Sequence, residues 1–329
     1  MQKNTTTIWR KNKVFFGKYT IFDLKLQSLL HLQQIKEIAK AVGFDLCGVT
    51  RPRHFEAEEA FLRTWIEQGK GSTLGYLERN IDKRGDARLL VEGAKSVIVC
   101  GVAYKSDISN GYPDSHRTKI ASYACTTDYH TTIKQMLGEL CSRLKEVCPS
   151  LGGRIFTDSA PLFEKRYAVE AGLGWIGRQS LLVTPTHGTF VLLGEAVITE
   201  ECDTYDEPLK AVGCGECRRC IEACPTKAVE MHHIDTRRCI SRLTIEREEA
   251  HGTEVDCHGW VFGCDECQSC CPYNKRAPMA TNKRFAPLFD PREMGGEEWQ
   301  KIGEAEFSTR FAQTPLSRSS LERILRNIK

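Results

Sequence analysis

The sequence predicts an α/β (α+β) domain followed by a cysteine-rich metal domain, and three observations support this fold class. Helical and strand-like hydrophobic patterns alternate over about residues 24–200. Eleven of the 16 cysteines lie between Cys202 and Cys271. An acidic stretch, TEECDTYDEP at 199–208, separates the two regions, so we expect a domain boundary there.

The elements of the first region follow from local patterns. Apolar residues recur at helical spacing over about 24–44, and DLCGV at 45–49 is expected to be a short strand. Further helices are expected at 57–69, 72–80, 129–148 and 161–172, the third of them ended by Pro149. Strands are expected at 96–104, 153–158, 180–185 and 189–199.

One glycine motif resembles a nucleotide-binding loop only in its spelling. GLGWIG at 172–177 has the G-x-G-x-x-G spacing of a dinucleotide loop. That loop must follow a strand and open a helix, whereas here a helix is expected before it and a strand after it. We therefore interpret it as a tight glycine turn.

Composition and charge exclude several classes. The chain has 329 residues, 41% of them hydrophobic, 27% charged, and a formal net charge of +3, as in ordinary globular proteins. A membrane span needs about 18–20 apolar residues, and no apolar run is close to that length. The first residues show no export signal. We expect a cytoplasmic protein with no membrane partner. The charge alone neither favours nor excludes a nucleic-acid partner.

The first cysteine run has the spacing of a bacterial ferredoxin. Cys214, Cys217, Cys220 and Cys224 follow one another at C-x₂-C-x₂-C-x₃-C-P. In such runs three thiolates bind one [4Fe–4S] cluster and the fourth crosses to a second cluster. A zinc site needs neither the third cysteine at this interval nor the Cys-Pro pair. The run therefore favours iron–sulfur clusters over zinc.

The second run, GCDECQSCCPYNK, repeats part of this pattern. Aligned on Pro272, its Cys264, Cys267 and Cys271 match Cys217, Cys220 and Cys224. Cys271 is then the crossing ligand of the first cluster, and Cys270 is expected to point elsewhere. The second cluster keeps Cys224, Cys264 and Cys267 but lacks a fourth ligand, because Val261 occupies that position. Spacing leaves Cys239 and Cys257 open as the fourth ligand, with Cys270 a distant third.

Several stretches together make the chain similar to the epoxyqueuosine reductase family of tRNA-modification enzymes. They are GFDLCGVTRP, RLLVEGAKSVIV, SYACTTDYH, FTDSAPLFEKRYAVEAGLGWIG, LGEAVI, the two cysteine runs, RRCISRLTIE and FSTRFAQTPLSR. The resemblance implies an oxidoreductase that reduces the epoxide of epoxyqueuosine, at the wobble position of a tRNA, to queuosine. It implies two [4Fe–4S] clusters, a cobalamin and an external low-potential electron donor.

The resemblance also implies the domain organisation. A nitroreductase-like cobalamin-binding domain is expected at 24–205 and a ferredoxin-like domain with two clusters at 206–285. An N-terminal extension (1–23) is expected before them, and a C-terminal helical segment without a long helical-repeat extension (286–329) after them. We expect a monomer.

The family motifs assign residues to the site. The cysteine of RRCISRLTIE is a cluster ligand in the family, which selects Cys239, so the second cluster is expected on Cys224, Cys239, Cys264 and Cys267. The first is expected on Cys214, Cys217, Cys220 and Cys271. Residues matching cobalamin contacts are Tyr123, Asp128, His130, Asp158, Ser241, Cys264 and Asp265.

Asp158 has two interpretations. From the residues alone it is a helix cap, because TDSAP precedes an expected helix and Asp or Ser commonly caps one. The resemblance to the family instead implies that Asp158 is the proton donor to the departing epoxide oxygen, in which case Ser159 could cap the helix. An acid in this role must hold its proton near neutral pH, which burial would favour.

Basic residues on the cysteine-rich region are candidates for phosphate contacts. Arg237, Arg242, Lys275 and Arg276 are expected to contact the anticodon stem-loop of the tRNA, although a solvated face is the ordinary role of such residues. Two alternative functions share the cluster pattern. A reductive dehalogenase would resemble the chain in architecture but typically carries an export signal, and a simple electron-transfer ferredoxin would need no catalytic domain.

Overall fold

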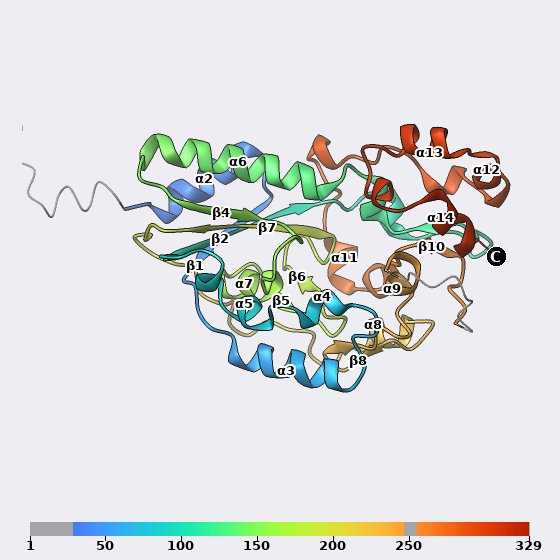
Figure 1. The fold of residues 1–329 in the computed structure, drawn as a ribbon, viewed down its shortest axis with the longest axis horizontal. Coiled ribbons are helices and arrows are strands. Elements are labelled where there is room, and N and C mark those ends of the chain that lie inside the picture. The colour runs from blue at the N-terminus through green and yellow to red at the C-terminus, as the bar shows by residue number, and fades with distance from the viewer. Residues whose placement is uncertain (1–28, 247–254, 329) are drawn as a thin grey trace, which may run out of the picture.

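The computed structural model describes residues 29–246 and 255–328 (Figure 1). The expected N-terminal extension, 1–23, and the start of the first expected helix lie outside these residues. Within the part of the chain that the structure describes, no helix is long and apolar enough to cross a membrane.

The first region is built on one antiparallel sheet. Its strands run in the order β1 (Leu46–Thr50), β2 (Ser96–Ala103), β7 (Val191–Ile198) and β4 (Gly153–Phe156), and each neighbouring pair is antiparallel. The two inner strands, β2 and β7, pair over their whole length. The first region therefore has the mixed helix-and-sheet character expected from the sequence. Among the four described strands of its sheet, no two neighbouring strands are parallel.

Helices cover both faces of this sheet (Figure 1). On one face α2 (Leu32–Val42) and α6 (Tyr129–Val147) pack on a core that includes Ile98 and Ala196. On the other face α7 (Glu164–Glu170) packs on a second core that includes Val99 and Val197. Alternate residues of β2 and β7 thus enter different cores, as the period of a strand requires.

The first helix is shorter than its apolar pattern predicted. Leu30, which the pattern placed in the helix, forms a parallel bridge with Cys202. The helix begins at Leu32, where the carboxylate of Asp203 accepts the backbone N–H at 2.9 Å. The helix ends at Gly43, which adopts the left-handed conformation. The acidic stretch therefore caps this helix from a distant part of the chain.

The expected helix at 72–80 is also only partly formed. Only α4 (Gly75–Glu78) forms there. Asn80, which has a positive φ, interrupts the helical conformation before α5 (Ile81–Gly85). The helix α3 (Glu56–Glu67) is close to its expected bounds. GLGWIG lies after α7 and leads through β5 (Trp175–Ile176) into β6 (Leu182–Val183), which confirms a tight turn and not a dinucleotide loop.

The cysteine-rich region is made of short elements. These are α8 (Arg219–Ala223), β8 (Val229–Glu230), β9 (His233–Ile234), α9 (Ile240–Ile245), β10 (Trp260–Phe262), α10 (Glu266–Ser269) and α11 (Pro272–Arg276). Its β10 pairs in parallel with β3 (Lys119–Ile120) of the first region. The buried Lys105 donates from Nζ to the carbonyls of Asn274 and Ala277, each at 2.6 Å. A strand pair and a buried cation therefore fix the cysteine-rich region against the sheet domain.

The last segment packs over this junction. It contains α12 (Gly296–Lys301), α13 (Glu304–Arg310) and α14 (Leu321–Asn327), with 3₁₀ turns at Lys283–Phe285, Pro291–Glu293 and Pro315–Arg318. Earlier 3₁₀ turns are Ala87–Leu89, Asp107–Asn110 and Ser122–Cys125. Trp299 and Phe311 share one core with Ile120 and Phe262, so this core joins all three parts of the chain.

Candidate active site

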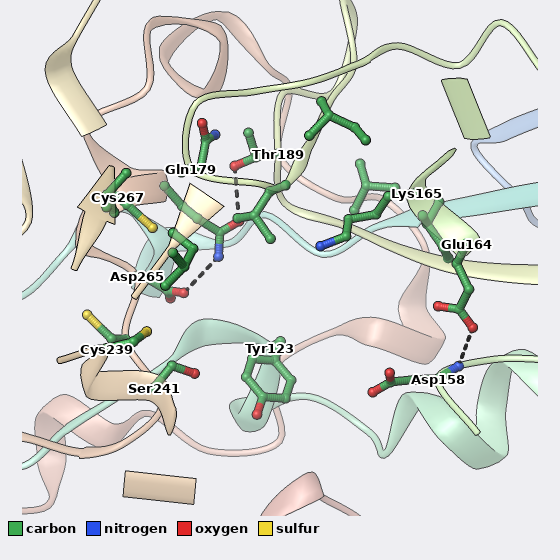
Figure 2. A pocket seen from close by; sticks show the side chains of 18 of the residues that line it. Tyr123, Asp158, Glu164, Lys165, Gln179, Thr189, Cys239, Ser241, Asp265 and Cys267 are labelled. Carbon is green, nitrogen blue, oxygen red and sulfur yellow. Dashed lines mark hydrogen bonds between the residues drawn. The ribbon is translucent and has the colours of Figure 1, made fainter. Parts of the chain in front are cut away.

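A cavity of about 700 Å³ lies between the sheet domain and the cysteine-rich region (Figure 2). Residues of α3, α7 and the loop after β4 line it on the sheet-domain side, and cysteines line it on the other. Its volume is in the range of roughly 300–1,000 Å³ found for cofactor and ligand sites. A simple electron carrier would need no such cavity.

One group of four cysteines forms part of the cavity wall. Cys224, Cys239, Cys264 and Cys267 all line it. Burial raises the pKa of Cys267, and the nearby thiols of Cys264 and Cys239 raise it further. Cys224 is close enough to Cys239 to raise the pKa of that thiol. The sulfur of Cys224 also accepts the backbone N–H of Ala228 at 3.2 Å. The thiols expected to hold the second cluster are therefore brought together.

The other four expected ligands gather away from the cavity. Burial raises the pKa of Cys220, and the thiols of Cys214, Cys271 and Cys217 add to this rise. Cys214 and Cys217 are only half-buried, so this group lies nearer the protein surface. Cys270 donates instead to the carbonyl of Cys267 at 3.5 Å, as expected for a thiol outside the cluster.

The cysteine groups do not have the form of a mononuclear metal site. Among residues 29–246 and 255–328, no group of three or more His, Cys, Asp or Glu is arranged to hold a single metal ion. A [4Fe–4S] cluster instead takes one thiolate at each of four separate iron atoms. The two groups of four cysteines fit this requirement.

Asp265 fixes the wall next to Cys264. Its buried carboxylate accepts from the backbone N–H and the hydroxyl of Ser122, at 2.7 and 2.8 Å. Gln268 donates to its other oxygen at 3.1 Å and accepts from the hydroxyl of Thr189 (Figure 2). Ser241 lines the cavity on the same side. Side chains from three parts of the chain thus hold this wall in one arrangement.

Asp158 lies across the cavity from the cysteines (Figure 2). The hydroxyl of Tyr129 donates to its Oδ2 at 2.5 Å, and Nε2 of His130 lies 3.6 Å from the same oxygen. Burial raises the pKa of Asp158, but the hydrogen bonds from His130 and Tyr129 outweigh this, so the pKa lies below its usual value. The carboxyl is 63% accessible, and this accessible surface faces the cavity.

Neither Asp158 nor Ser159 caps the following helix, so the capping expectation is wrong. The N-cap of α7 is Phe163, and no side chain closes this end. The chain bends through 157–161 before the helix begins. Instead of Asp158 capping the helix, a side chain of the helix binds Asp158: Glu164 in the first turn of α7 accepts the backbone N–H of Asp158 at 2.6 Å.

Two expected cobalamin contacts lie behind the cavity rather than on its wall. Asp128 caps α6, accepting from the backbone N–H of His130 at 3.1 Å, and also contacts the imidazole Nδ1 at 2.8 Å. Burial lowers the pKa of His130, but hydrogen bonds with Asp128 and Asp158 outweigh it, so the pKa is raised. Of this group, Tyr123 does line the cavity (Figure 2).

Sequence reasoning missed several polar residues of the cavity. Glu164, Lys165, Gln179 and Arg84 line it, and Glu195 lies behind Glu164. One signal was available, since Glu195 is an isolated acid within the apolar strand sequence VLLGEAVI. Charged residues are almost never fully buried without a partner or a function.

The cavity fits a large organic cofactor with amide groups at its edge, such as a corrin. Its walls are mainly apolar, formed by side chains such as Leu162, Leu193 and Ile240. Two polar atoms of the lining, Nε2 of Gln179 and Nε of Arg84, are buried without a hydrogen-bond partner among the described residues. Buried polar groups normally have partners, so these atoms are suited to a polar group of a bound molecule.

The fold and the site define an iron–sulfur oxidoreductase. Its two-cluster module lines one side of a cavity, and the carboxyl group of Asp158 lies on the opposite side. The family description "Epoxyqueuosine reductase QueG, DUF1730" matches residues 84–159, and "4Fe-4S double cluster binding domain" matches residues 213–274. The epoxyqueuosine reductase of Cyclobacterium marinum is 39% identical over 91% of this chain and 96% of its own length. This chain belongs to the epoxyqueuosine reductase family.

Solved structures give the same result. An epoxyqueuosine reductase bound to an epoxyqueuosine-modified tRNA-Tyr stem loop is similar at a TM-score of 0.80 and 26% identity, over 94% of this chain and 80% of that one. The enzyme from Bacillus subtilis, with its catalytic aspartate loop swung out of the active site, is similar at 0.79 and 25% identity, over 94% and 81%. The cofactors of the family are two [4Fe–4S] clusters and cobalamin, and the residues described above fit both.

Proposed function

We propose that this chain reduces the epoxide of epoxyqueuosine, at the wobble position of a tRNA anticodon, to the alkene of queuosine. The observation that carries the proposal is the cavity, because four cluster cysteines line one side and Asp158 lies opposite them. When bound, cobalamin supplies a strongly reducing centre for C–O cleavage, and the clusters supply single electrons. Tyr123, Ser241, Cys264 and Asp265 would hold the corrin.

The arrangement of the cysteines gives the proposed electron path a direction. Cys224, Cys239, Cys264 and Cys267 would hold the cluster next to the cavity. Cys214, Cys217, Cys220 and Cys271 would hold the outer cluster, which lies nearer the surface. An external low-potential donor would therefore deliver electrons to the outer cluster first.

Asp158 would place the proton on the departing epoxide oxygen. In the open cavity its pKa is lowered by its two hydrogen bonds. Cofactor and nucleotide would displace water from the carboxyl, and this desolvation favours its neutral form. His130, whose pKa is raised because its hydrogen bonds with Asp128 and Asp158 outweigh burial, lies 3.6 Å away and is a positioned source of that proton. Asp128 would orient the imidazole.

The tRNA would lie over the mouth of the cavity, with the wobble base turned inward, since an anticodon loop offers unpaired bases. Lys275 and Arg276 are exposed at the end of α11 and remain our candidates for phosphate contacts. Arg237 and Arg242 are weaker candidates, because Arg237 is engaged by Asp235 and Arg242 by Thr73. We also propose a cytoplasmic monomer with domains at 24–205 and 206–285 and a helical segment at 286–329.

Nucleoside analysis of tRNA from cells lacking this gene tests the proposal. We expect epoxyqueuosine to accumulate and queuosine to disappear, and both to return to normal when the gene is restored. Unchanged queuosine in the deletion strain, in the absence of a second reductase gene, would contradict the proposed substrate.

A further inference from the structure

The backbone of Asp158 is held in an unfavourable conformation. Its φ of +46° lies in the left-handed region, which residues other than glycine rarely adopt. Such a conformation persists only where surrounding contacts enforce it. The contact at this position is the hydrogen bond from the backbone N–H of Asp158 to Oε1 of Glu164, at 2.6 Å (Figure 2).

The carboxyl group that accepts this bond lies against a second carboxyl group. Glu195 is on the inner strand β7, opposite Val99 of β2 and Phe156 of β4, and it is fully buried. Its side chain is within hydrogen-bonding reach of Glu164. Among the described residues, neither oxygen of Glu195 has a hydrogen-bond donor.

A shared proton resolves this arrangement. Two carboxylates in contact cannot both ionise without strong repulsion, and an unpaired buried charge is costly. A proton between the two groups turns the contact into a hydrogen bond and gives one oxygen of Glu195 a partner. The other oxygen of Glu164 stays available to accept the N–H of Asp158.

No cation takes the place of this proton in the structure as described. Lys165 faces the cavity, but its Nζ donates to the carbonyl of Ser180 at 2.7 Å, and burial lowers its pKa. The other titratable or charged groups that act on the pair come from the elements around it. They are Asp158 on the loop, Tyr129 on α6, Arg84 on α5 and Cys100 on β2.

We propose that Glu164 and Glu195 share a proton and that this carboxyl pair holds Asp158 in its place in the cavity. The inference rests on the role proposed above for Asp158, and it makes Glu164 and Glu195 positioning residues, since neither is assigned to the reacting atoms. Losing the last shared proton would drive the two carboxylates apart and release the loop. The Bacillus subtilis relative shows that a loop of this kind can leave the site.

The pKa shifts agree with the proposal. Burial and the neighbouring charge of Asp158 together raise the pKa of Glu164 to about 7. Burial and the neighbouring Glu164 raise the pKa of Glu195 well above its ordinary value. The pair therefore keeps a proton up to a higher pH than solvated carboxyl groups would.

Hydrogen exchange of the peptide that contains Asp158 tests the proposal without any need for activity. In the holoprotein with both clusters, we expect E164A to exchange the amide of Asp158 about 10-fold faster than wild type, because one charge-assisted hydrogen bond is lost. E164Q keeps an acceptor oxygen and should stay within about 3-fold of wild type. E170A is the matched control, since it removes another buried acid of α7 that binds Arg53 and Arg166. Equal exchange in E164A and wild type would overturn the proposal.

The pH profile of turnover separates positioning from a merely structural role. With each profile normalised to its own maximum, we expect E195Q to shift the alkaline limb of kcat upward by at least about one pH unit, because its amide donates to Glu164 without titrating. Superimposed alkaline limbs would contradict the shared proton. Wild-type protein that is inactive on epoxyqueuosine-tRNA would refute the proposed substrate, while the exchange experiment would still decide the role of the pair.

Discussion

Asp158 is constrained at both its backbone and its side chain. Glu164 holds its N–H, whereas Tyr129 and His130 hold its carboxyl. These contacts come from two different helices, α6 and α7, that lie on opposite faces of the sheet. A carboxyl group fixed in this way at a cavity wall is suited to deliver a proton in one direction.

The variant Asp158→Asn tests this role. Asparagine keeps the size of the side chain and one acceptor oxygen, but its amide cannot act as a general acid. We expect kcat on epoxyqueuosine-tRNA to fall by about 10²–10⁴-fold, the usual contribution of general acid catalysis. The absorbance of the clusters and the binding of cobalamin should match wild type. Near-normal turnover would remove Asp158 from this role.

Sequence reasoning at the residue scale reached furthest where the motif is local. The cysteine spacing predicted all four ligands of the outer cluster and three ligands of the inner cluster, because the two runs follow the ferredoxin pattern. Cys239 lies far along the chain from the other ligands, so spacing could not choose it over Cys257. The carboxyl pair was missed because Glu164 and Glu195 are 31 positions apart, as their numbers show, and meet only through the packing of α7 on β7.

At the scale of elements, the start of α9 places Cys239 on the cavity wall with Cys224, Cys264 and Cys267. Cys239 is the N-cap of α9 and lines the cavity, whereas Cys257 lies on the segment before β10. We expect Cys239→Ala, purified without oxygen, to fall from about eight irons per chain to about four, with loss of the inner cluster. Cys257→Ala should keep about eight. The reverse pattern would assign the ligand to Cys257.

The close approach of β1 to α7 depends on a glycine. A Cβ at Gly48 would lie 2.1 Å from the carbonyl oxygen of Ala171, at the end of α7. We expect Gly48→Ala to destabilise the protein by about 1–3 kcal/mol, measured by denaturant unfolding. Gly138→Ala in α6 is the control, because a Cβ there meets no atom within 4 Å and alanine favours the helix. Equal stability of the two variants would contradict the close contact.

Element boundaries were predicted less well than element types, for a physical reason. The first helix was expected to include Leu30, but a bridge to Cys202 and a cap from Asp203 start it at Leu32. The order of the sheet, β1-β2-β7-β4, was not predicted at all. Both depend on contacts between distant segments, which local patterns do not report.

At the scale of the whole molecule, the carboxyl pair predicts how stability depends on pH. The folded-state pKa of Glu164 is raised from 4.5 to about 7, and that of Glu195 is also raised well above its ordinary value. The stability that the protonated pair contributes is fully present at a pH below the ordinary pKa of glutamate. It is lost as the pH rises through about 7 and above. We expect Tm to fall by about 5 °C or more between pH 6 and pH 9, and by clearly less in Glu195→Gln. An equal fall in both proteins would contradict the raised pKa values.

The two parts of the molecule depend on each other for the reaction. The cavity exists only where the cysteine-rich region meets the sheet domain, and the β3–β10 pair, Lys105 and the core around Trp299 and Phe311 fix that junction. Electrons are expected from one side and the proton from the other. The central claim is therefore that this cavity reduces an epoxide carried by tRNA.

Mass analysis of nucleosides after reaction tests this claim most directly. Purified holoprotein with both clusters and cobalamin would be incubated, without oxygen, with epoxyqueuosine-containing tRNA and a chemical reductant. We predict conversion of epoxyqueuosine to queuosine, which is lighter by one oxygen atom, with none formed when cobalamin or the reductant is omitted. Epoxyqueuosine that stays intact with the fully loaded protein would contradict the account.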